Sequence, residues 1–215
     1  MHSNPSYILI SFLKKDLKLG RVVVLPDFFI DRFVKVPSLD MLLNTVREKV
    51  ERGGGSVHGF EQIEVKGGNA VNTAYALGRL QVPTALITVA DSRSSWLLES
   101  SFEAVKKSVE VMVLEGKPGY TVSLEFKRAG GLVNVMLSDV GDVARFGPDT
   151  LRKADFDVIS KADMVAVMNW AANRMSGTEL CSRVFSYAKN NGARTIFAPA
   201  DFTGRVEVFR EAVDI

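Results

Sequence analysis

Short apolar runs alternate with amphipathic stretches along most of the chain. Residues 22–25 read Val-Val-Val-Leu, a composition typical of a strand that is buried on both faces. Residues 39–52 place leucine and valine three and four residues apart, which predicts a helix capped by Ser38. The same two patterns predict strands near residues 60–66, 84–89, 109–114, 163–168 and 194–198, and helices near residues 69–80, 94–107, 148–161, 176–191 and 205–212. This order predicts an α/β fold in which helices flank a mostly parallel sheet.

One segment departs from this alternation and predicts a small second sheet. Apolar and polar residues alternate strictly over residues 120–127, two glycines at 130 and 131 favour a turn, and the alternation resumes over residues 133–137. This pattern predicts an antiparallel hairpin with one apolar face. That face needs cover, which the extended residues 28–37, a cleft or another subunit could provide. We therefore predict a β-sheet lid from about residues 28–37 and 119–138.

Length and composition are those of one folded domain. The chain has 215 residues, of which 47% are hydrophobic and 24% charged. A chain of this size buries roughly 70% of its extended surface on folding. We predict an N-terminal extension at residues 1–20 and one α/β domain at residues 21–215. The apolar residues 7–13 are too few to span a membrane, and the lysines follow them instead of preceding them, which predicts a cytoplasmic protein.

Charge and residue usage argue against several classes of function. Lys and Arg number 27 against 25 Asp and Glu, and the resulting net charge of +2 gives no support to a nucleic-acid partner. The single cysteine, Cys181, excludes an intrachain disulfide and falls in a helical pattern, which favours a structural role over that of a nucleophile. With only His2 and His58 present, the sequence predicts no zinc site and no serine hydrolase.

The sharpest candidate site is the segment Lys66-Gly67-Gly68-Asn69-Ala70-Val71-Asn72. The two glycines allow a ligand close to the backbone, and they open a helix whose first N–H groups have no partner inside the helix. Asn69 and Asn72 are three residues apart and share one side of the first turn. Because neutral amides both donate and accept hydrogen bonds, they suit the hydroxyls of a sugar or nucleoside better than a phosphate. On spacing alone, a plain glycine turn with an asparagine cap is an equal alternative.

Two more polar residues follow predicted strands. Asp31 comes shortly after the first strand, where its carboxylate could accept hydrogen bonds from two neighbouring hydroxyls. The alternative is a solvated loop residue paired with Arg32. Asn169 and Trp170 follow the strand near residues 163–168, and ligands of parallel sheets bind outside the carboxyl ends of the strands. Asn169 is therefore a candidate for the same cleft, while Trp170 could instead pack beneath the lid.

Together these features resemble the ribokinase-like (PfkB-type) family of sugar and nucleoside kinases. The resemblance covers the first strand leading to an Asp, the lid strand, the Gly-Gly-Asn-x-x-Asn helix with its Ala-x-x-Leu-Gly-Arg-Leu tail, and the order of elements up to Ile215. It implies a three-layer α/β sandwich with a β-sheet lid that often mediates homodimerisation. It also implies transfer of the ATP γ-phosphate to a carbohydrate-like alcohol, with ATP and Mg²⁺ as cofactors. The positions that it assigns to substrate binding are Asp31, Gly68, Asn69 and Asn72, to which we add Gly67 and Asn169 as candidates.

The sequence departs from the family where catalysis is concerned. The family supplies its catalytic Asp and its phosphate-binding amides from a Gly-Ala-Gly-Asp turn near the C-terminus, and no such turn occurs here. Gly141-Asp142 is the segment most similar to that turn, but it follows a lid strand. In addition, Asp201 stands near the place where many members of the family have an Asn. The resemblance implies that the catalytic, nucleotide and metal sites lie downstream of Ile215. The chain would then be about the first two thirds of a kinase and inactive alone.

Two other functions are open at this point. A non-catalytic protein could keep the sugar- or nucleoside-binding half and lack ATP turnover. An interaction module could instead use the apolar face of the hairpin, near Val122 and Leu124, to form a dimer around a vestigial cleft. No membrane partner is predicted.

Overall fold

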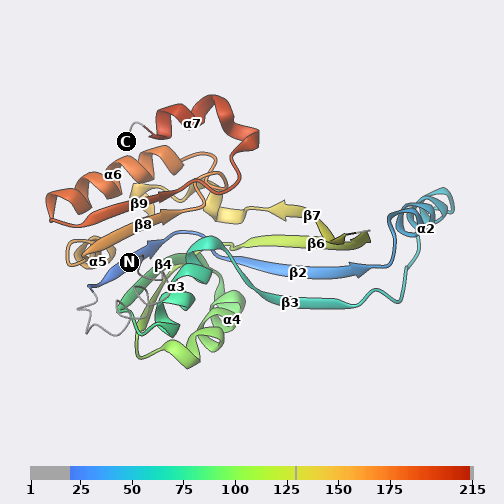
Figure 1. Cartoon of the computed structure of the whole chain (residues 1–215), viewed down its shortest axis with the longest axis horizontal. Helices are drawn as coiled ribbons and strands as arrows, with labels where there is room; N and C mark the ends of the chain where they lie inside the picture. Colours follow the sequence, from blue (N-terminus) through green and yellow to red (C-terminus); the bar gives the residue numbers. More distant parts are fainter. Residues whose placement is uncertain (1–19, 129, 214–215) are drawn as a thin grey trace, which may run out of the picture.

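The computed structural model describes residues 20–128 and 130–213, so the predicted N-terminal extension, apart from Gly20, lies outside the described residues. The central sheet is parallel and has the strand order β5-β4-β1-β8-β9 (Figure 1). Its strands are β1 (Val22–Leu25), β4 (Thr84–Ala90), β5 (Val109–Glu115), β8 (Met164–Met168) and β9 (Arg194–Ala198). The chain first adds β4 and β5 on one side of β1, and later returns to add β8 and β9 on the other side.

Helices cover both faces of this sheet. On one face lie α3 (Asn69–Arg79) and α4 (Ser92–Phe102), and on the other lie α5 (Lys153–Ile159), α6 (Gly177–Asn190) and α7 (Val206–Val213) (Figure 1). Because neighbouring side chains of a strand point to opposite faces, Val24 enters the core beneath α3 while Val23 and Leu25 enter the core beneath α6. The predicted α/β sandwich is confirmed.

The lid is a four-stranded sheet with the order β3-β2-β6-β7, which extends away from the body (Figure 1). Its strands are β2 (Phe29–Val36), β3 (Gln62–Gly67), β6 (Gly119–Arg128) and β7 (Gly131–Asp139). β6 and β7 form the predicted antiparallel hairpin, and β6 also pairs in parallel with β2 along the whole of that strand. The two predicted lid segments are therefore hydrogen-bonded neighbours in one sheet.

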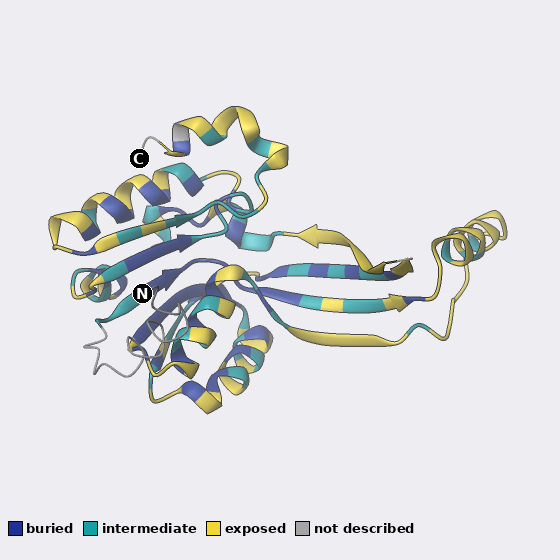
Figure 2. Ribbon diagram, viewed as in Figure 1, coloured by how far each residue is buried: buried dark blue, intermediate teal, exposed yellow. Residues whose placement is uncertain are grey.

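The outer strands of the lid are the most exposed strands of the structure (Figure 2). All of β7 is exposed, and so are the first four residues of β3. The prediction of a half-buried strand near residues 60–66 is wrong for most of its length, because an edge strand of a sheet that stands away from the body has no helix to cover it. α2 (Leu39–Glu51) lies at the far end of the lid, and the Ser38 hydroxyl accepts the N–H of Met41 at 3.1 Å, as its predicted cap requires.

Two predicted helices have different bounds in the structure. The pattern near residues 148–161 predicts one helix, but the structure has a 3₁₀ turn, η3 (Pro148–Thr150), an extended Leu151, and then α5. Asp155 restarts the helix because its carboxylate accepts the N–H of Arg152 at 2.7 Å. α4 begins two residues before the predicted residue 94, since Asp91 caps it, and it ends in η1 (Glu103–Val105). The other short turns are η2 (Gly141–Arg145) and η4 (Thr203–Arg205).

Two single residues have clear structural roles. Cys181 is fully buried in α6, and burial raises the pKa of its thiol to about 12, which supports the structural role. Trp170 does not pack beneath the lid as one alternative predicts. It is buried on the α6 side of the sheet, with ring contacts to Phe197 and Phe209 and a hydrogen bond from Nε1 to Thr178 at 3.1 Å.

No helix within the described residues is both long and apolar enough to cross a membrane.

Candidate functional site

The predicted site residues gather at the carboxyl ends of β1 and β8. These neighbouring parallel strands flank the point where the strand order of the sheet reverses. Loops leave such a point in opposite directions, so a crevice for ligands opens between them. Asp27 follows β1, Asn169 follows β8, and the Gly67–Gly68 pair joins β3 to α3 beside them.

The centre of this cluster is Asp27, a residue that the sequence analysis does not single out. Its side chain is fully buried. One carboxylate oxygen accepts the backbone N–H of Asn69 at 2.7 Å and the side-chain amide of Asn169 at 2.8 Å. The other oxygen accepts the N–H of Ala70 at 2.8 Å. Asp27 therefore connects the end of β1 to the start of α3 and to the end of β8.

Asp27 also supplies the cap that α3 lacks locally. Gly68 is the N-cap residue and offers no side chain, so the predicted asparagine cap is not formed. The carboxylate of Asp27 satisfies two of the free N–H groups in the first turn and lies at the positive end of the helix dipole. Burial raises the pKa of Asp27, and its three hydrogen-bond donors oppose that shift.

At both glycine positions of the motif, a side chain would clash with a neighbouring residue. Gly68 has φ of +98°, and a Cβ there would lie 2.6 Å from the carbonyl oxygen of Asp27. A Cβ on Gly67 would collide with the carboxylate of Asp31. The first glycine thus makes room for a side chain of the site, whereas the second makes room for backbone.

Asp31 lies within β2, where it pairs with Val65 of β3 and Thr121 of β6. The alternative of a loop residue paired with Arg32 is wrong, because Arg32 binds Glu64 at 2.7 Å and points to the opposite face of the strand. Burial raises the pKa of Asp31; a hydrogen bond with Thr121 lowers it and the charge of Asp27 raises it. A half-buried carboxylate of this kind has free acceptor capacity beside the glycine pair.

Asn72 lies one turn into α3 and is oriented by Lys66, which the sequence analysis includes in the motif without a role. The Lys66 ammonium donates to Asn72 Oδ1 at 3.3 Å and lies 4.3 Å from the centre of the Tyr75 ring. Burial lowers the pKa of Lys66. Because the oxygen of the Asn72 amide faces Lys66, its NH₂ group is left to donate.

The structure thus brings most of the predicted residues together. Asp31, Gly67, Gly68, Asn69 and Asn169 all contact Asp27 or one another. Asn72 is connected to them only through the first turn of α3. A sequence signal for Asp27 exists, since it is the first polar residue after β1. In the structure Asn169 has φ of +53°, in the left-handed region where asparagine is one of the few non-glycine residues found regularly.

Two acidic positions considered for catalysis or substrate contact are engaged in local contacts. Asp142 is at the base of the lid, where it accepts the N–H of Lys117 at 2.8 Å and pairs with Arg145. Asp201 is exposed and accepts the hydroxyl of Thr203 at 2.7 Å. Among residues 20–128 and 130–213, no group of three His, Cys, Asp or Glu side chains could hold a metal ion.

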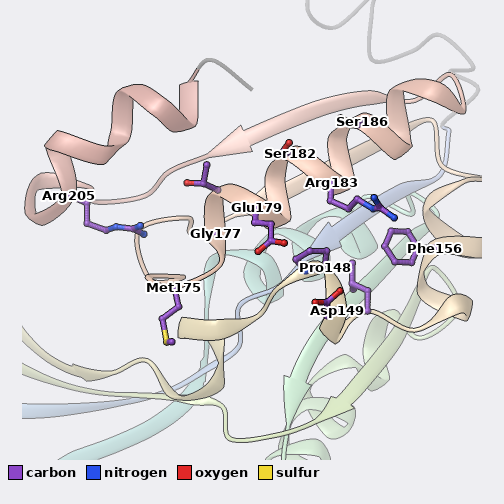
Figure 3. Close-up of a pocket in the computed structure, with 12 residues that line it drawn as sticks. Pro148, Asp149, Phe156, Met175, Gly177, Glu179, Ser182, Arg183, Ser186 and Arg205 are labelled. Carbon is purple, nitrogen blue, oxygen red and sulfur yellow. The ribbon is translucent and has the colours of Figure 1, made fainter.

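A groove of about 1030 Å³ among the described residues is a different feature (Figure 3). It lies along α6 and is closed by η3, α5, Met175 and Arg205. The Arg205 guanidinium is engaged by the carbonyls of Trp170 and Asn173 at 2.9 and 3.0 Å. None of the predicted substrate-binding residues lines this groove, so size alone does not locate the site.

No protein-family model and no curated protein sequence matches the chain. Several solved structures do match it. Adenosine kinase from Sinorhizobium meliloti has a TM-score of 0.64 at 14% identity, over 91% of this chain and 63% of that one. A probable sugar kinase from Rhizobium etli CFN 42 has 0.65 at 14%, over 92% and 61%. Arabidopsis thaliana ribokinase complexed with ribose and ATP has 0.57 at 17%, over 84% and 53%.

These similarities show that the chain has the ribokinase-like fold, as its resemblance to that family implies. At such identities the likeness concerns the fold alone. The chain spans between 53% and 63% of the length of the three kinases.

Proposed function

We propose that this chain forms the substrate-binding part of a kinase that transfers phosphate from ATP to a hydroxyl of a sugar or nucleoside. The observation that carries the proposal is the meeting of Asp31, the Gly67–Gly68 backbone and Asn169 around the buried Asp27. They meet at the switch point of a sheet whose fold is shared with solved sugar and nucleoside kinases.

The hydrogen-bonding groups of this cluster suit a ligand with several hydroxyls. Asp31 offers a carboxylate that accepts. Asn169 uses its NH₂ on Asp27 and so offers Oδ1 as a second acceptor, whereas Asn72 uses its oxygen on Lys66 and offers NH₂ as a donor. Because a hydroxyl both donates and accepts, a row of neighbouring hydroxyls can satisfy acceptors and donor together. Their fixed positions would orient the reacting hydroxyl without large rearrangement.

The described residues do not fit a nucleotide or its metal ion. Gly141 and Asp142 begin the 3₁₀ turn η2, but the Asp142 carboxylate is bound to the N–H of Lys117 and to Arg145 at the base of the lid. No group of three His, Cys, Asp or Glu side chains among the described residues could hold a metal ion. The use of ATP and Mg²⁺ is proposed from the fold, which the chain shares with a ribokinase solved with ribose and ATP.

The direct test is phosphate transfer by the polypeptide expressed from the complete gene. It is incubated with ATP, Mg²⁺ and a panel that includes ribose, fructose and adenosine, and the products are analysed by mass spectrometry. The proposal predicts that one class of compound gains a phosphate. Binding of a panel member without any transfer by that polypeptide would favour the alternative of a non-catalytic binding protein.

Asp31→Asn should weaken binding of the ligand identified in that panel by roughly 10- to 100-fold, because an ionised acceptor of hydroxyl hydrogen bonds is replaced by a neutral amide. The wild-type affinity should fall as the pH drops through the raised pKa of Asp31 and should level off above it. The variant should lose this acid dependence. Calorimetric titrations over a pH series measure both effects, and an equally steep pH profile in Asp31→Asn would remove Asp31 from the site.

Three other expectations stay predictions. We expect residues 21–215 to form one domain with residues 1–20 as an extension, and we expect a cytoplasmic location. We also expect the lid, with its inserted helix α2, to mediate homodimerisation.

A further inference from the structure

α2 carries an apolar seam that its own sheet leaves uncovered. Leu39, Leu43, Val46 and Val50 are exposed by 53%, 50%, 45% and 71%. They follow one another at intervals of four, three and four residues, which is the spacing of the apolar seam in a coiled coil. No residue of α2 is buried.

The helix is also loosely seated on the lid. Leu42, Thr45 and Lys49 are only partly exposed and mark the side that faces the sheet. A cavity of about 390 Å³, lined by Leu42, Val46 and residues of β2 and β6, remains between the helix and the lid. At 100° per residue, the centre of the seam lies about a quarter turn from the side that faces the sheet. The seam is therefore accessible at the end of the lid farthest from the body (Figure 1).

The seam is complementary to itself when a second helix runs in the opposite direction. This reversal places Leu39 opposite Val50 and Leu43 opposite Val46 of the second copy. By symmetry, Leu39 and Leu43 of the second copy lie opposite Val50 and Val46 of the first. Asp40 and Arg47, which are both exposed, border the seam on the side away from the sheet. The reversal brings Asp40 within about 3 Å along the axis of Arg47 of the second copy. Neither side chain forms an ion pair within the described residues.

We infer that α2 is a self-association surface, on which α2 of a second copy packs antiparallel through these four apolar residues. Two identical pairs, Asp40 with Arg47 of the second copy and the reverse, favour the antiparallel direction, because a parallel two-fold arrangement would put these residues on opposite flanks of the interface, where neither pair can form. The interface is independent of kinase activity and distinct from the sheet of the lid. It is small, as a 13-residue helix is about 20 Å long, so we expect a dissociation constant of about micromolar order.

Sedimentation velocity of the whole chain over a concentration series of about 1 to 200 µM tests this inference, because the series brackets the expected dissociation constant. Wild type should pass from monomer to dimer. Leu43→Glu should raise the dissociation constant at least about 100-fold, because two leucines lose their burial in a symmetric dimer. Leu43 is exposed on its own chain, so circular dichroism should show an unchanged fold.

The charges provide a second, directional test. Asp40→Arg and Arg47→Asp should each weaken the dimer, since each brings two pairs of like charges together. The double variant Asp40→Arg/Arg47→Asp should restore it to within about threefold of wild type, because both pairs return with reversed sign. A double variant that is weaker than either single variant would overturn the antiparallel arrangement.

Leu137→Glu is the matched control for a dimer formed through the lid sheet, since Leu137 is an exposed apolar residue of β7. Our inference predicts that it leaves the dimer of α2 intact. A wild-type chain that stays monomeric throughout the series would overturn the inference. So would a dimer that Leu137→Glu abolishes and Leu43→Glu does not.

Discussion

Asp27→Ala should lower the free energy of unfolding by about 4 kcal/mol, because it leaves three buried donors without an acceptor. These donors are the N–H groups of Asn69 and Ala70 and the amide of Asn169, all within 2.8 Å of the carboxylate. The loss should also release Asn169 and the start of α3, so ligand binding should weaken together with stability. Urea denaturation followed by circular dichroism measures the change.

Asp91→Ala is the matched control for this prediction. Asp91 also accepts a backbone N–H at the start of a helix, from Ser94 at 2.8 Å, but it is partly exposed and serves one helix only. Its removal should cost about 1 kcal/mol, the usual effect of losing an N-cap. If the two variants lost equal stability, Asp27 would be an ordinary helix cap. Its hydrogen bonds between β1, α3 and β8 would then add nothing further to the free energy of unfolding.

Gly68→Ala should destabilise the fold by about 4 kcal/mol, through an unfavourable left-handed φ and a clash that cannot relax easily. The new Cβ would lie 2.6 Å from the carbonyl oxygen of Asp27 and 3.1 Å from Cα of Phe28, both backbone atoms. Relief would require α3 to move away from β1, which would also break the hydrogen bonds to Asp27. Thermal unfolding with the same two-state analysis gives the value.

Gly130→Ala is the control that separates the cost of an unfavourable backbone conformation from the cost of a steric clash. Gly130 has φ of +109°, similar to Gly68, but a Cβ there would meet no atom within 4 Å. We expect a loss of about 1–2 kcal/mol from the conformation alone. Equal losses in the two variants would show that the approach of Gly68 to Asp27 contributes nothing to stability.

The fold was largely predictable because periodicity reports burial. The all-apolar β1 and the small-residue side of α3, with Ala70 and Ala74 buried, follow directly from how strands and helices pack. The alternation over residues 120–137 likewise predicted the lid hairpin. Periodicity failed where a local hydrogen bond decides, as at Asp155, which restarts a helix after an extended Leu151.

The site was predictable only in part. The Gly-Gly-Asn motif and Asp31 could be singled out because the chemistry of each suits hydroxyl recognition. Asp27 was missed since its importance comes from partners 42 and 142 residues away in sequence, Asn69 and Asn169. The role of Lys66 depends on how its side chain lies over Tyr75, which sequence spacing does not determine. A pattern can nominate residues for a site, but long-range contacts decide which of them hold it together.

The central claim is that Asp31 and the Gly67–Asn72 segment form one hydroxyl-binding site, and Gly67→Ala tests it most directly. The three heavy atoms nearest to the added methyl group all belong to the carboxyl group of Asp31, so this carboxylate has to move. Calorimetric titration of wild type and Gly67→Ala with ribose, fructose and adenosine is the measurement. The account predicts that wild type binds at least one of them, and that Gly67→Ala weakens this binding at least about tenfold, while its unfolding free energy changes by less than about 1 kcal/mol. Binding of the same ligand with equal affinity by both proteins would contradict the claim, as would no binding by wild type.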